Sequence, residues 1–283
     1  MHTRKIALLT GTSSGIGLAA AVALARAGHT TIATMRDPDR AGPLRAAAAA
    51  AGVELEVAAL DVGDPASISA GVTAALERHG RIDVLVNNAG AGFVGSLEHT
   101  TAEDLRRVFA VNFFGTWEMT RAVLPAMRAA GGGRIIQVTS IGGVVGQPFN
   151  DAYCAAKFAV EGMCEALAPV VRGFGVHVTL FEPGAVASQF VANLADSLVA
   201  RQAAVDDPYA ETFAAYLERA RGMIDGAQTP EAVGEAIVAL AGQAEPPLRV
   251  QSSEAARQFV ELKLCESDGA ALTRTMRAWI APA

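Results

Sequence analysis

Short apolar runs alternate with longer stretches of helical periodicity from the start of the chain to about residue 182. Short apolar runs bounded by turn residues are typical of buried strands, and apolar residues that recur about every three or four positions are typical of helices. This alternation predicts an α/β fold, a doubly wound parallel sheet with right-handed crossovers and helices on both faces. The expected strands are residues 5–10, 30–35, 53–60, 82–87, 134–140 and 176–182, and the expected helices begin near residues 15, 39, 65, 101 and 151.

The pattern changes after Pro183-Gly184. Residues 188–228 have helical amphipathic periodicity and no strand among them, so we expect a helical substrate-binding insertion beside the carboxyl edge of the sheet. Because no Pro-, Ser- or Gly-rich linker interrupts the chain, residues 1–283 are expected to form a single domain. The remaining expected elements are a helix at 230–242, a short strand near 248–250 and a helical tail at 254–283.

Composition narrows the class of protein. Hydrophobic residues make up 51% of the 283 positions, enough for a sizeable core, and the net charge of −6 argues against a nucleic-acid-binding surface. Three cysteines without a Cys-x-x-Cys pair fit a reducing compartment better than a disulfide framework. The N-terminal apolar stretch is too short for a signal peptide or a membrane span, and the histidines have no metal-ligand spacing. We therefore expect a soluble, cytoplasmic protein that holds no metal.

A glycine-rich loop lies between the first expected strand and the first helix. Glycines permit a tight turn and let backbone N–H groups approach a pyrophosphate, which the positive end of a helix also favours. Such a loop in isolation can be turn chemistry alone, but its place between strand and helix favours a Rossmann-type nucleotide site. The candidate cofactor contacts in this loop are Gly11, Ser13, Ser14, Gly15, Ile16 and Gly17.

Two further strand ends carry candidate cofactor contacts. Asp61, followed by Val62, could accept a hydrogen bond from an adenine amino group. It could equally cap the helix that starts near residue 65, although Asp64 is better placed for that role. Asn88, Ala89 and Gly90 end another strand, and their small size would let the backbone approach a ribose. Asparagine at a strand end can also be a plain turn former.

The end of the second expected strand bears on cofactor choice. Arg36 stands there and Asp37 follows it. An arginine suits the 2′-phosphate of NADP, whereas an acidic residue suits the ribose 2′-hydroxyl of NAD. Arg36 therefore favours NADP(H), while Asp37 leaves competition by NAD(H) open.

Ser140, Tyr153 and Lys157 form a candidate proton-handling set. Tyr153 and Lys157 are four residues apart and share one helix face. A neighbouring ammonium favours the phenolate, so we expect the pKa of Tyr153 to fall from its usual ~10 toward neutral pH. Ser140 ends a buried strand and brings a hydroxyl to the ligand-binding edge of the sheet. Tyr-x-x-x-Lys is common in helices, so the assignment depends on the glycine-rich loop upstream.

The whole set of motifs resembles the short-chain dehydrogenase/reductase family. The resemblance implies an enzyme that transfers hydride between a nicotinamide and a C=O or CH–OH group, with NADP contacts from Ser13 and Arg36. It also implies that Pro183, Gly184 and Val186 line the nicotinamide pocket, and that helices over 107–127 and 153–171 form a homodimer or homotetramer. The matching residues, in family order, are Thr10-Gly11-x-x-x-Gly15-x-Gly17, Asn87-Asn88-Ala89-Gly90, Asn112, Ser140, Tyr153-x-x-x-Lys157 and Pro183-Gly184.

The resemblance also implies catalytic roles. Tyr153 would be the acid or base, Ser140 would polarise the substrate carbonyl, and Lys157 would bind the nicotinamide ribose and lower the pKa of Tyr153. Asn112 would anchor a water that links Lys157 to solvent. The alternative for Asn112 is a cap on the helix that continues through Trp117.

The segment 146–159 is similar to the catalytic segment of the branch of 17-beta-hydroxysteroid dehydrogenase type 1 and photoreceptor retinol dehydrogenase, and segments 33–37 and 174–178 resemble it as well. A bulky hydrophobic ketone or secondary alcohol, such as a steroid, retinoid or aromatic carbonyl compound, is therefore expected. Glu211 stands where the steroid dehydrogenase has a substrate-binding histidine. The candidate substrate contacts are Val144, Val145, Phe149 and Glu211. A 3-oxoacyl thioester reductase and a non-catalytic NADP-binding sensor are the alternatives.

Overall fold

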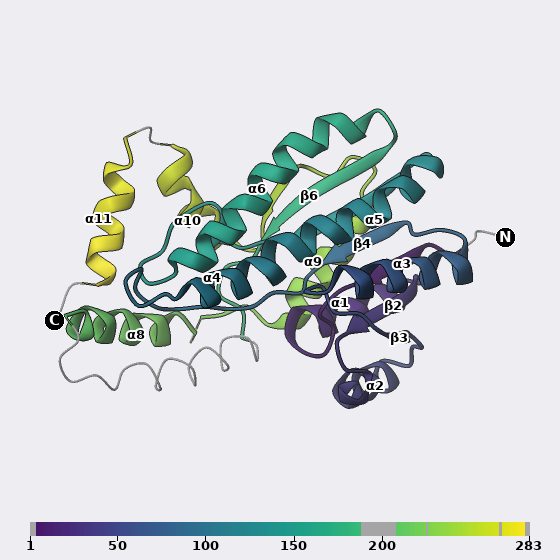
Figure 1. The fold of residues 1–283 in the computed structure, drawn as a ribbon, viewed down its shortest axis with the longest axis horizontal. Helices are drawn as coiled ribbons and strands as arrows, with labels where there is room; N and C mark the ends of the chain where they lie inside the picture. The colour runs from purple at the N-terminus through teal and green to yellow at the C-terminus, as the bar shows by residue number, and fades with distance from the viewer. Residues whose placement is uncertain (1–3, 188–207, 225, 266–267, 281–283) are drawn as a thin grey trace.

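A seven-stranded parallel sheet forms the centre of the computed structural model, which describes residues 4–187, 208–224, 226–265 and 268–280 (Figure 1). The strand order β3-β2-β1-β4-β5-β6-β7 reverses direction between β1 and β4. Each neighbouring pair is parallel, which confirms the predicted doubly wound sheet. The strands are β1 (Ile6–Leu9), β2 (Thr30–Met35), β3 (Glu56–Ala59), β4 (Val84–Asn87), β5 (Gly133–Val138), β6 (Val176–Glu182) and β7 (Arg249–Gln251).

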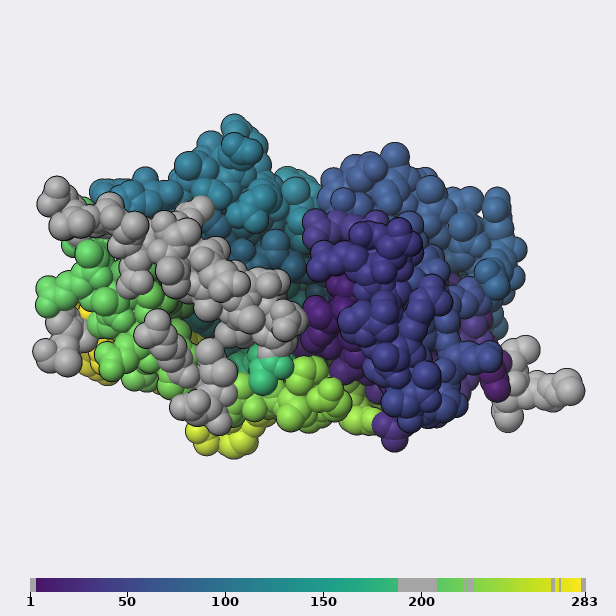
Figure 2. Space-filling view, turned by 90° about the horizontal axis from the view of Figure 1, so that it is seen from below, coloured from purple at the N-terminus to yellow at the C-terminus, as the bar shows by residue number. Residues whose placement is uncertain are grey.

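Helices cover both faces of the sheet because successive strand side chains point to opposite sides. Leu8 belongs to the core cluster under α3, α5 and α6, and its neighbour Leu9 belongs to the cluster under α1, α2 and α9. α1 packs against α9, and in Figure 2 the purple N-terminal segment and the light green α9 lie side by side. These helices are α1 (Gly15–Arg26), α2 (Gly42–Ala50), α3 (Pro65–His79), α5 (Gly115–Ala129), α6 (Asp151–Arg172) and α9 (Pro230–Gly242).

Three further helices gather at one end of the molecule, on the left of Figure 1. They are α8 (Ala210–Ile224), α10 (Glu254–Leu264) and α11 (Ala270–Trp279). The helical character predicted for 188–228 is confirmed for α8, whereas residues 188–207 of the predicted insertion lie outside the described residues. The helical tail predicted for 254–283 is likewise confirmed for α10 and α11.

The predicted bounds of β3 were wrong. The strand expected at 53–60 is only Glu56–Ala59, because Gly52 takes a left-handed φ of 65° and the Val53 N–H closes the end of α2 on Ala48 O at 3.0 Å. The helix expected from about residue 39 is a 3₁₀ turn, Pro38–Arg40, followed by α2.

One helical segment runs from α4 (Ala102–Phe109) through a π-helical turn, Ala110–Phe114, into α5. The hydroxyl of Thr101 caps its start by accepting a hydrogen bond from Asp104 N at 3.1 Å. Asn112 therefore lies inside a continuous helix, so the alternative that it caps a helix was wrong. Single π turns of this kind are frequent at functional sites.

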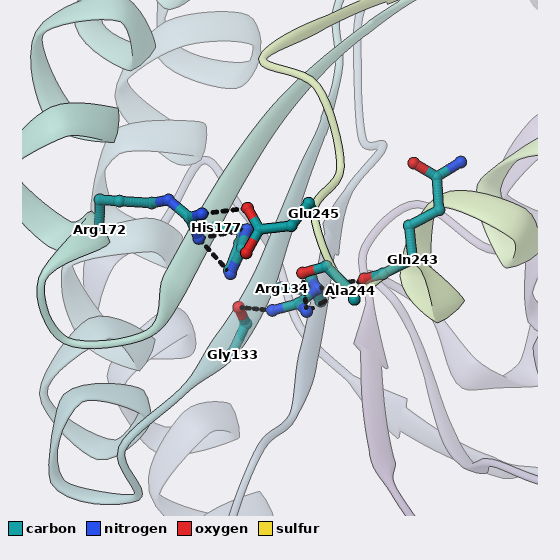
Figure 3. A network of polar contacts seen from close by, with 7 residues as sticks. All are labelled: Gly133, Arg134, Arg172, His177, Gln243, Ala244 and Glu245. Atoms are coloured by element: carbon teal, nitrogen blue, oxygen red, sulfur yellow. Dashed lines mark hydrogen bonds and ion pairs between the residues drawn. The ribbon is translucent and has the colours of Figure 1, made fainter.

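A polar network fixes the chain before β7 at the amino ends of β5 and β6 (Figure 3). The guanidinium of Arg134 donates to the carbonyls of Gln243 and Ala244 at 3.0 Å each. Arg172, at the end of α6, pairs with Glu245 and contacts the ring of His177. These contacts direct β7 alongside β6.

In the part of the chain that the structure describes, no helix is long and apolar enough to cross a membrane.

Candidate active site

The glycine-rich loop and the end of β4 meet where the strand order reverses. Gly11 has a φ of 69°, and a Cβ atom there would lie 2.7 Å from Ala89 Cα. A Cβ on Gly17 would lie 2.2 Å from Gly11 O and 2.3 Å from Asn88 Nδ2. Side chains at Gly11 and Gly17 would therefore collide with the backbone, so the loop requires glycine at both positions.

Hydrogen bonds fix this loop to the end of β4. The Thr10 hydroxyl accepts from the backbone N–H groups of Asn88 (3.1 Å) and Ala89 (3.0 Å). The Asn88 side-chain amide donates to the carbonyls of Thr10 (3.0 Å) and Gly11 (2.9 Å). The role of Thr10 was not foreseen from the sequence, because it depends on two strands far apart in the chain.

The start of α1 fits a phosphate group. Ser14 is the N-cap residue, and its side chain makes no capping hydrogen bond, so the first N–H groups of the helix are free of side-chain caps. Ser13 and Gly15 are partly exposed beside it, as is Ile16. A helix N-terminus with accessible N–H groups favours a phosphate, so this chain's loop fits the phosphates of a dinucleotide.

The ends of β2 and β3 adjoin the same edge. Arg36 and Asp37 are both exposed there, and the Asp37 carboxylate accepts from Asp39 N at 3.0 Å. Asp61 accepts from Gly63 N at 2.9 Å and does not cap α3, because Asp64 makes that cap through Ala66 N. The predicted alternative role for Asp61 as the cap was therefore wrong.

Val62 and Gly90 are two further residues predicted to contact the cofactor. Val62 is buried against the start of α5, where a Cβ on Gly115 would lie 2.6 Å from Val62 O. A Cβ on Gly90 would lie 3.1 Å from Asn112 Oδ1 and 3.8 Å from Lys157 Nζ. The end of β4 thus adjoins the candidate catalytic residues.

Ser140, Tyr153 and Lys157 come together between β5 and α6. Tyr153 is hydrogen-bonded to the Ser140 side chain. Lys157 is buried, its Nζ donates to Val138 O at 3.0 Å and lies 5.9 Å from the centre of the Tyr153 ring. The Ser140 hydroxyl accepts from Gly142 N at 3.0 Å, which fixes its direction.

The expectation that the pKa of Tyr153 falls toward neutral pH was wrong for the protein alone. Burial raises the pKa of Tyr153 to about 12, and the hydrogen bond with Ser140 only partly opposes that rise. Burial also lowers the pKa of Lys157 to about 8, while Glu161 acts to raise it. Loss of water is thus the largest influence on both pKa values, and the phenol is neutral at pH 7.

Asn112 is fully buried in the π-helical turn. Its side chain makes a closed pair of hydrogen bonds with Ala91, accepting from the N–H at 2.9 Å and donating to the carbonyl at 2.8 Å. This pair holds the chain after Gly90 against the helix. Asn112 and Lys157 both lie next to Gly90, and Asn112 is not at a helix end.

The segment that follows β6 lies next to Ile141, the residue after Ser140. Pro183 O accepts from Ile141 N at 3.1 Å, and Gly184 N donates to Ser252 Oγ at 3.1 Å. Val186 is buried and forms an isolated bridge with Gln228.

The candidate substrate residues occupy different environments. Val144 and Val145 are buried in a cluster with α10 and α11, whereas Glu211 is exposed on the first turn of α8. Phe149 has a φ of 60°, and its ring lies 4.9 Å from that of Phe213. Substrate contact by Val144, Val145, Phe149 and Glu211 stays a prediction.

Phe149 belongs to an aromatic cluster that joins α8 to the catalytic segment. The cluster includes Val94, Phe213 and Tyr216, all buried. The neighbouring Asn150 amide donates to the Tyr216 hydroxyl at 2.7 Å. Phe149 lies four residues and Asn150 three residues before Tyr153 in the chain.

The chain matches the family model described as short chain dehydrogenase over residues 5–198. It is 38% identical to Retinol dehydrogenase 8 from Bos taurus, over 95% of this chain and 88% of that protein. It is 38% identical to 17-beta-hydroxysteroid dehydrogenase type 1 from Homo sapiens, over 94% of this chain and 83% of that protein.

Among solved structures, the chain resembles a metagenomic short-chain oxidoreductase in complex with NADP, with a TM-score of 0.69 and 29% identity over 87% of this chain and 96% of that one. The chain belongs to the short-chain dehydrogenase family. It is an oxidoreductase that acts on alcohol or carbonyl groups, and the predicted branch is confirmed by the hydroxysteroid and retinol dehydrogenase relatives.

Proposed function

We propose that this enzyme transfers hydride between NADP(H) and a bulky, mostly apolar ketone or secondary alcohol. The observation that carries the proposal is the grouping of Ser140, Tyr153 and Lys157 beside a glycine cradle at the switch point of the sheet. Ligands of open α/β sheets bind at such a point. The predicted cofactor, NADP(H), agrees with the NADP-bound relative.

Bound NADPH supplies a hydride, and the residues of this chain supply binding, orientation and a proton. The cradle of Gly11, Gly17 and the start of α1 would hold the phosphates, and Arg36 would pair with the 2′-phosphate. Ser140 donates to the substrate oxygen and orients it. Tyr153, neutral at pH 7, gives its phenolic proton to that oxygen in reduction.

Lys157 holds a positive charge beside the ring of Tyr153. A buried ammonium stabilises the phenolate that forms when Tyr153 gives up its proton. Asn112, held against Ala91, keeps the helix and the end of β4 together next to Lys157. We propose that it also anchors the water through which Lys157 exchanges protons with solvent.

The aromatic cluster of Phe149, Phe213 and Tyr216 supports a hydrophobic substrate, because it places apolar side chains next to the segment that carries Tyr153, and apolar surroundings favour apolar ligands. The names of the two relatives point to steroid or retinoid substrates. We expect NADPH oxidation to be fastest with steroid ketones, retinal or aromatic ketones. The measurement is a rate screen that also contains small aldehydes and 3-oxoacyl thioesters, and activity confined to those two classes would reject the hydrophobic substrate.

We also propose a homodimer or homotetramer. Phe114 and Trp117 on the helical segment around α5 are exposed aromatic side chains, and Val170 on α6 is an exposed aliphatic one. Exposed apolar faces of this kind favour burial between copies. Light scattering at micromolar concentration should give a multiple of 29.1 kDa, and a mass near 29.1 kDa itself would contradict the proposal. The cytoplasmic location stays a prediction.

A further inference from the structure

A buried acidic residue, Glu161, follows Lys157 by four positions on α6 and therefore lies on the same helix face. Glu161 is only 4% exposed. The turn that follows Ser140 covers both side chains, because a Cβ on Gly143 would lie 3.1 Å from Glu161 Cγ and 3.4 Å from Lys157 Cβ. Glu161 and Lys157 are thus both buried against the turn that follows Ser140.

Arg249, at the start of β7, connects Glu161 to two other carboxylates. Its guanidinium lies 2.6 Å from Glu161 Oε2 and 2.9 Å from Glu182 Oε1, and it also pairs with Glu165. Glu182 is fully buried at the end of β6, and its second oxygen accepts from the Gln251 amide at 2.8 Å. The Glu165 side chain is 55% exposed, so the cluster reaches solvent at that residue.

The charges of this cluster favour a proton on Lys157. Three carboxylates surround one guanidinium, so Arg249 cannot balance the charge of all three. Of the three, Glu161 is the one that favours the protonated form of Lys157. Burial lowers the pKa of Lys157 to about 8, and Glu161 opposes that fall. Without Glu161 the pKa of Lys157 would be lower still. An amine with a pKa one unit above the pH is about nine-tenths protonated, and one with a pKa equal to the pH is half protonated.

The surroundings of Glu161 also shift the pKa of its own carboxyl group. Burial raises its pKa to about 7, with Glu182 and Glu165 adding to the rise, and the hydrogen bond with Thr139 and the charge of Arg249 opposing it. Burying a carboxylate is costly even when it is paired, as Glu161 is with Arg249, and buried charged groups with shifted pKa values cluster at functional sites.

We propose that Glu161 is a positioning residue whose buried carboxylate, held by Arg249, keeps Lys157 in its ammonium form. The carboxylate touches neither substrate nor cofactor and acts only through Lys157. For its effect on turnover, the inference rests on the proposed oxidoreductase function. Its effect on Lys157 itself can be measured without any substrate or cofactor.

Lysine NMR gives that measurement directly, because the chain has only three lysines, Lys5, Lys157 and Lys263. Protein labelled with ¹³C at lysine Cε should show one titrating signal for each. Glu161→Gln should lower the midpoint of Lys157 by about one pH unit and leave the other two in place. An unchanged Lys157 midpoint in this variant would overturn the proposal.

Two variants control for a merely structural role. Glu161→Asp keeps the charge and should restore most of the wild-type midpoint. Glu165→Gln removes a carboxylate that pairs with the same Arg249 but is one turn farther from Lys157, and should move the midpoint by less than about 0.3 pH unit. An equal shift in Glu165→Gln and Glu161→Gln would also contradict a specific role for Glu161.

If Glu161→Gln does not fold, the wild-type protein supplies a second test. Because the pKa of Glu161 lies near 7, the Lys157 signal should have an additional inflection near that pH as the carboxylate gains its proton. A single inflection, belonging to the amine alone, would reject the coupling.

The turnover measurement separates this inference from the proposed function. With an active carbonyl substrate, loss of activity on the basic side should begin about one pH unit lower in Glu161→Gln. Turnover with an unmoved Lys157 midpoint would reject the role of Glu161 alone. A moved midpoint in a protein that reduces no carbonyl compound would reject the proposed function alone.

Discussion

Tyr153→Phe is expected to lower turnover by at least about 100-fold while cofactor binding is retained. Phenylalanine keeps the ring between Ser140 and Lys157 but removes the hydroxyl that transfers the proton. Because burial raises the pKa of Tyr153 to about 12, the wild-type phenol is in the form that carbonyl reduction needs at pH 7. The measurement is kcat with the best carbonyl substrate of the screen, together with calorimetric titration of NADPH.

Tyr209→Phe is the matched control for this substitution. It removes a phenolic hydroxyl at the start of the α8 region, where the Tyr209 ring packs edge-on against His99. Turnover of this variant should stay within a few-fold of wild type. Turnover of Tyr153→Phe in the same range would reject Tyr153 as the acid and base.

Arg36→Ala is expected to reduce the preference for NADPH over NADH by about 1.5–3 kcal/mol, or about 10- to 150-fold in the ratio of their affinities. The physical reason is the planar guanidinium, which matches a phosphate and is exposed at the end of β2. The two affinities are measured by calorimetric titration in wild type and variant.

Arg45→Ala controls for the loss of a positive charge near β2, because Arg45 is an exposed arginine on α2. Arg45→Ala should leave the preference for NADPH over NADH unchanged. Equal affinities of the wild type for NADPH and NADH would instead assign the ribose to Asp37, whose carboxylate accepts from Asp39 N in the free protein.

The layered fold could be predicted from the sequence because its signals are local. Buried parallel strands have continuous apolar runs, and Gly11 and Gly17 mark the loop where the first of them ends. The boundaries of β3 could not be predicted, because Val53 is apolar in either role and only the closure of α2 on Ala48 decides between them.

The grouping of Ser140, Tyr153 and Lys157 could be predicted from the sequence, but the pKa values of Tyr153 and Lys157 could not. The Tyr153 and Lys157 spacing placed both on one helix face, yet the direction of the Tyr153 pKa depends on how much water the folded chain removes from the ring. Glu161 also had the right spacing on that face. Its pairing with Arg249 could not be predicted, because β7 is distant in sequence from α6 and β6 and only the fold brings Arg249 against them.

Transfer of deuterium from NADPH labelled at C4 of the nicotinamide, prepared in both configurations, tests the proposed reaction most directly. Each labelled cofactor is incubated with the wild-type enzyme and the steroid, retinoid and aromatic carbonyl compounds of the screen. One of the two should give an alcohol product one mass unit heavier, and Tyr153→Phe should form that product at least about 100-fold more slowly. If the enzyme binds NADPH but neither labelled form yields a heavier alcohol from any carbonyl compound, the oxidoreductase mechanism built on Ser140, Tyr153 and Lys157 is contradicted.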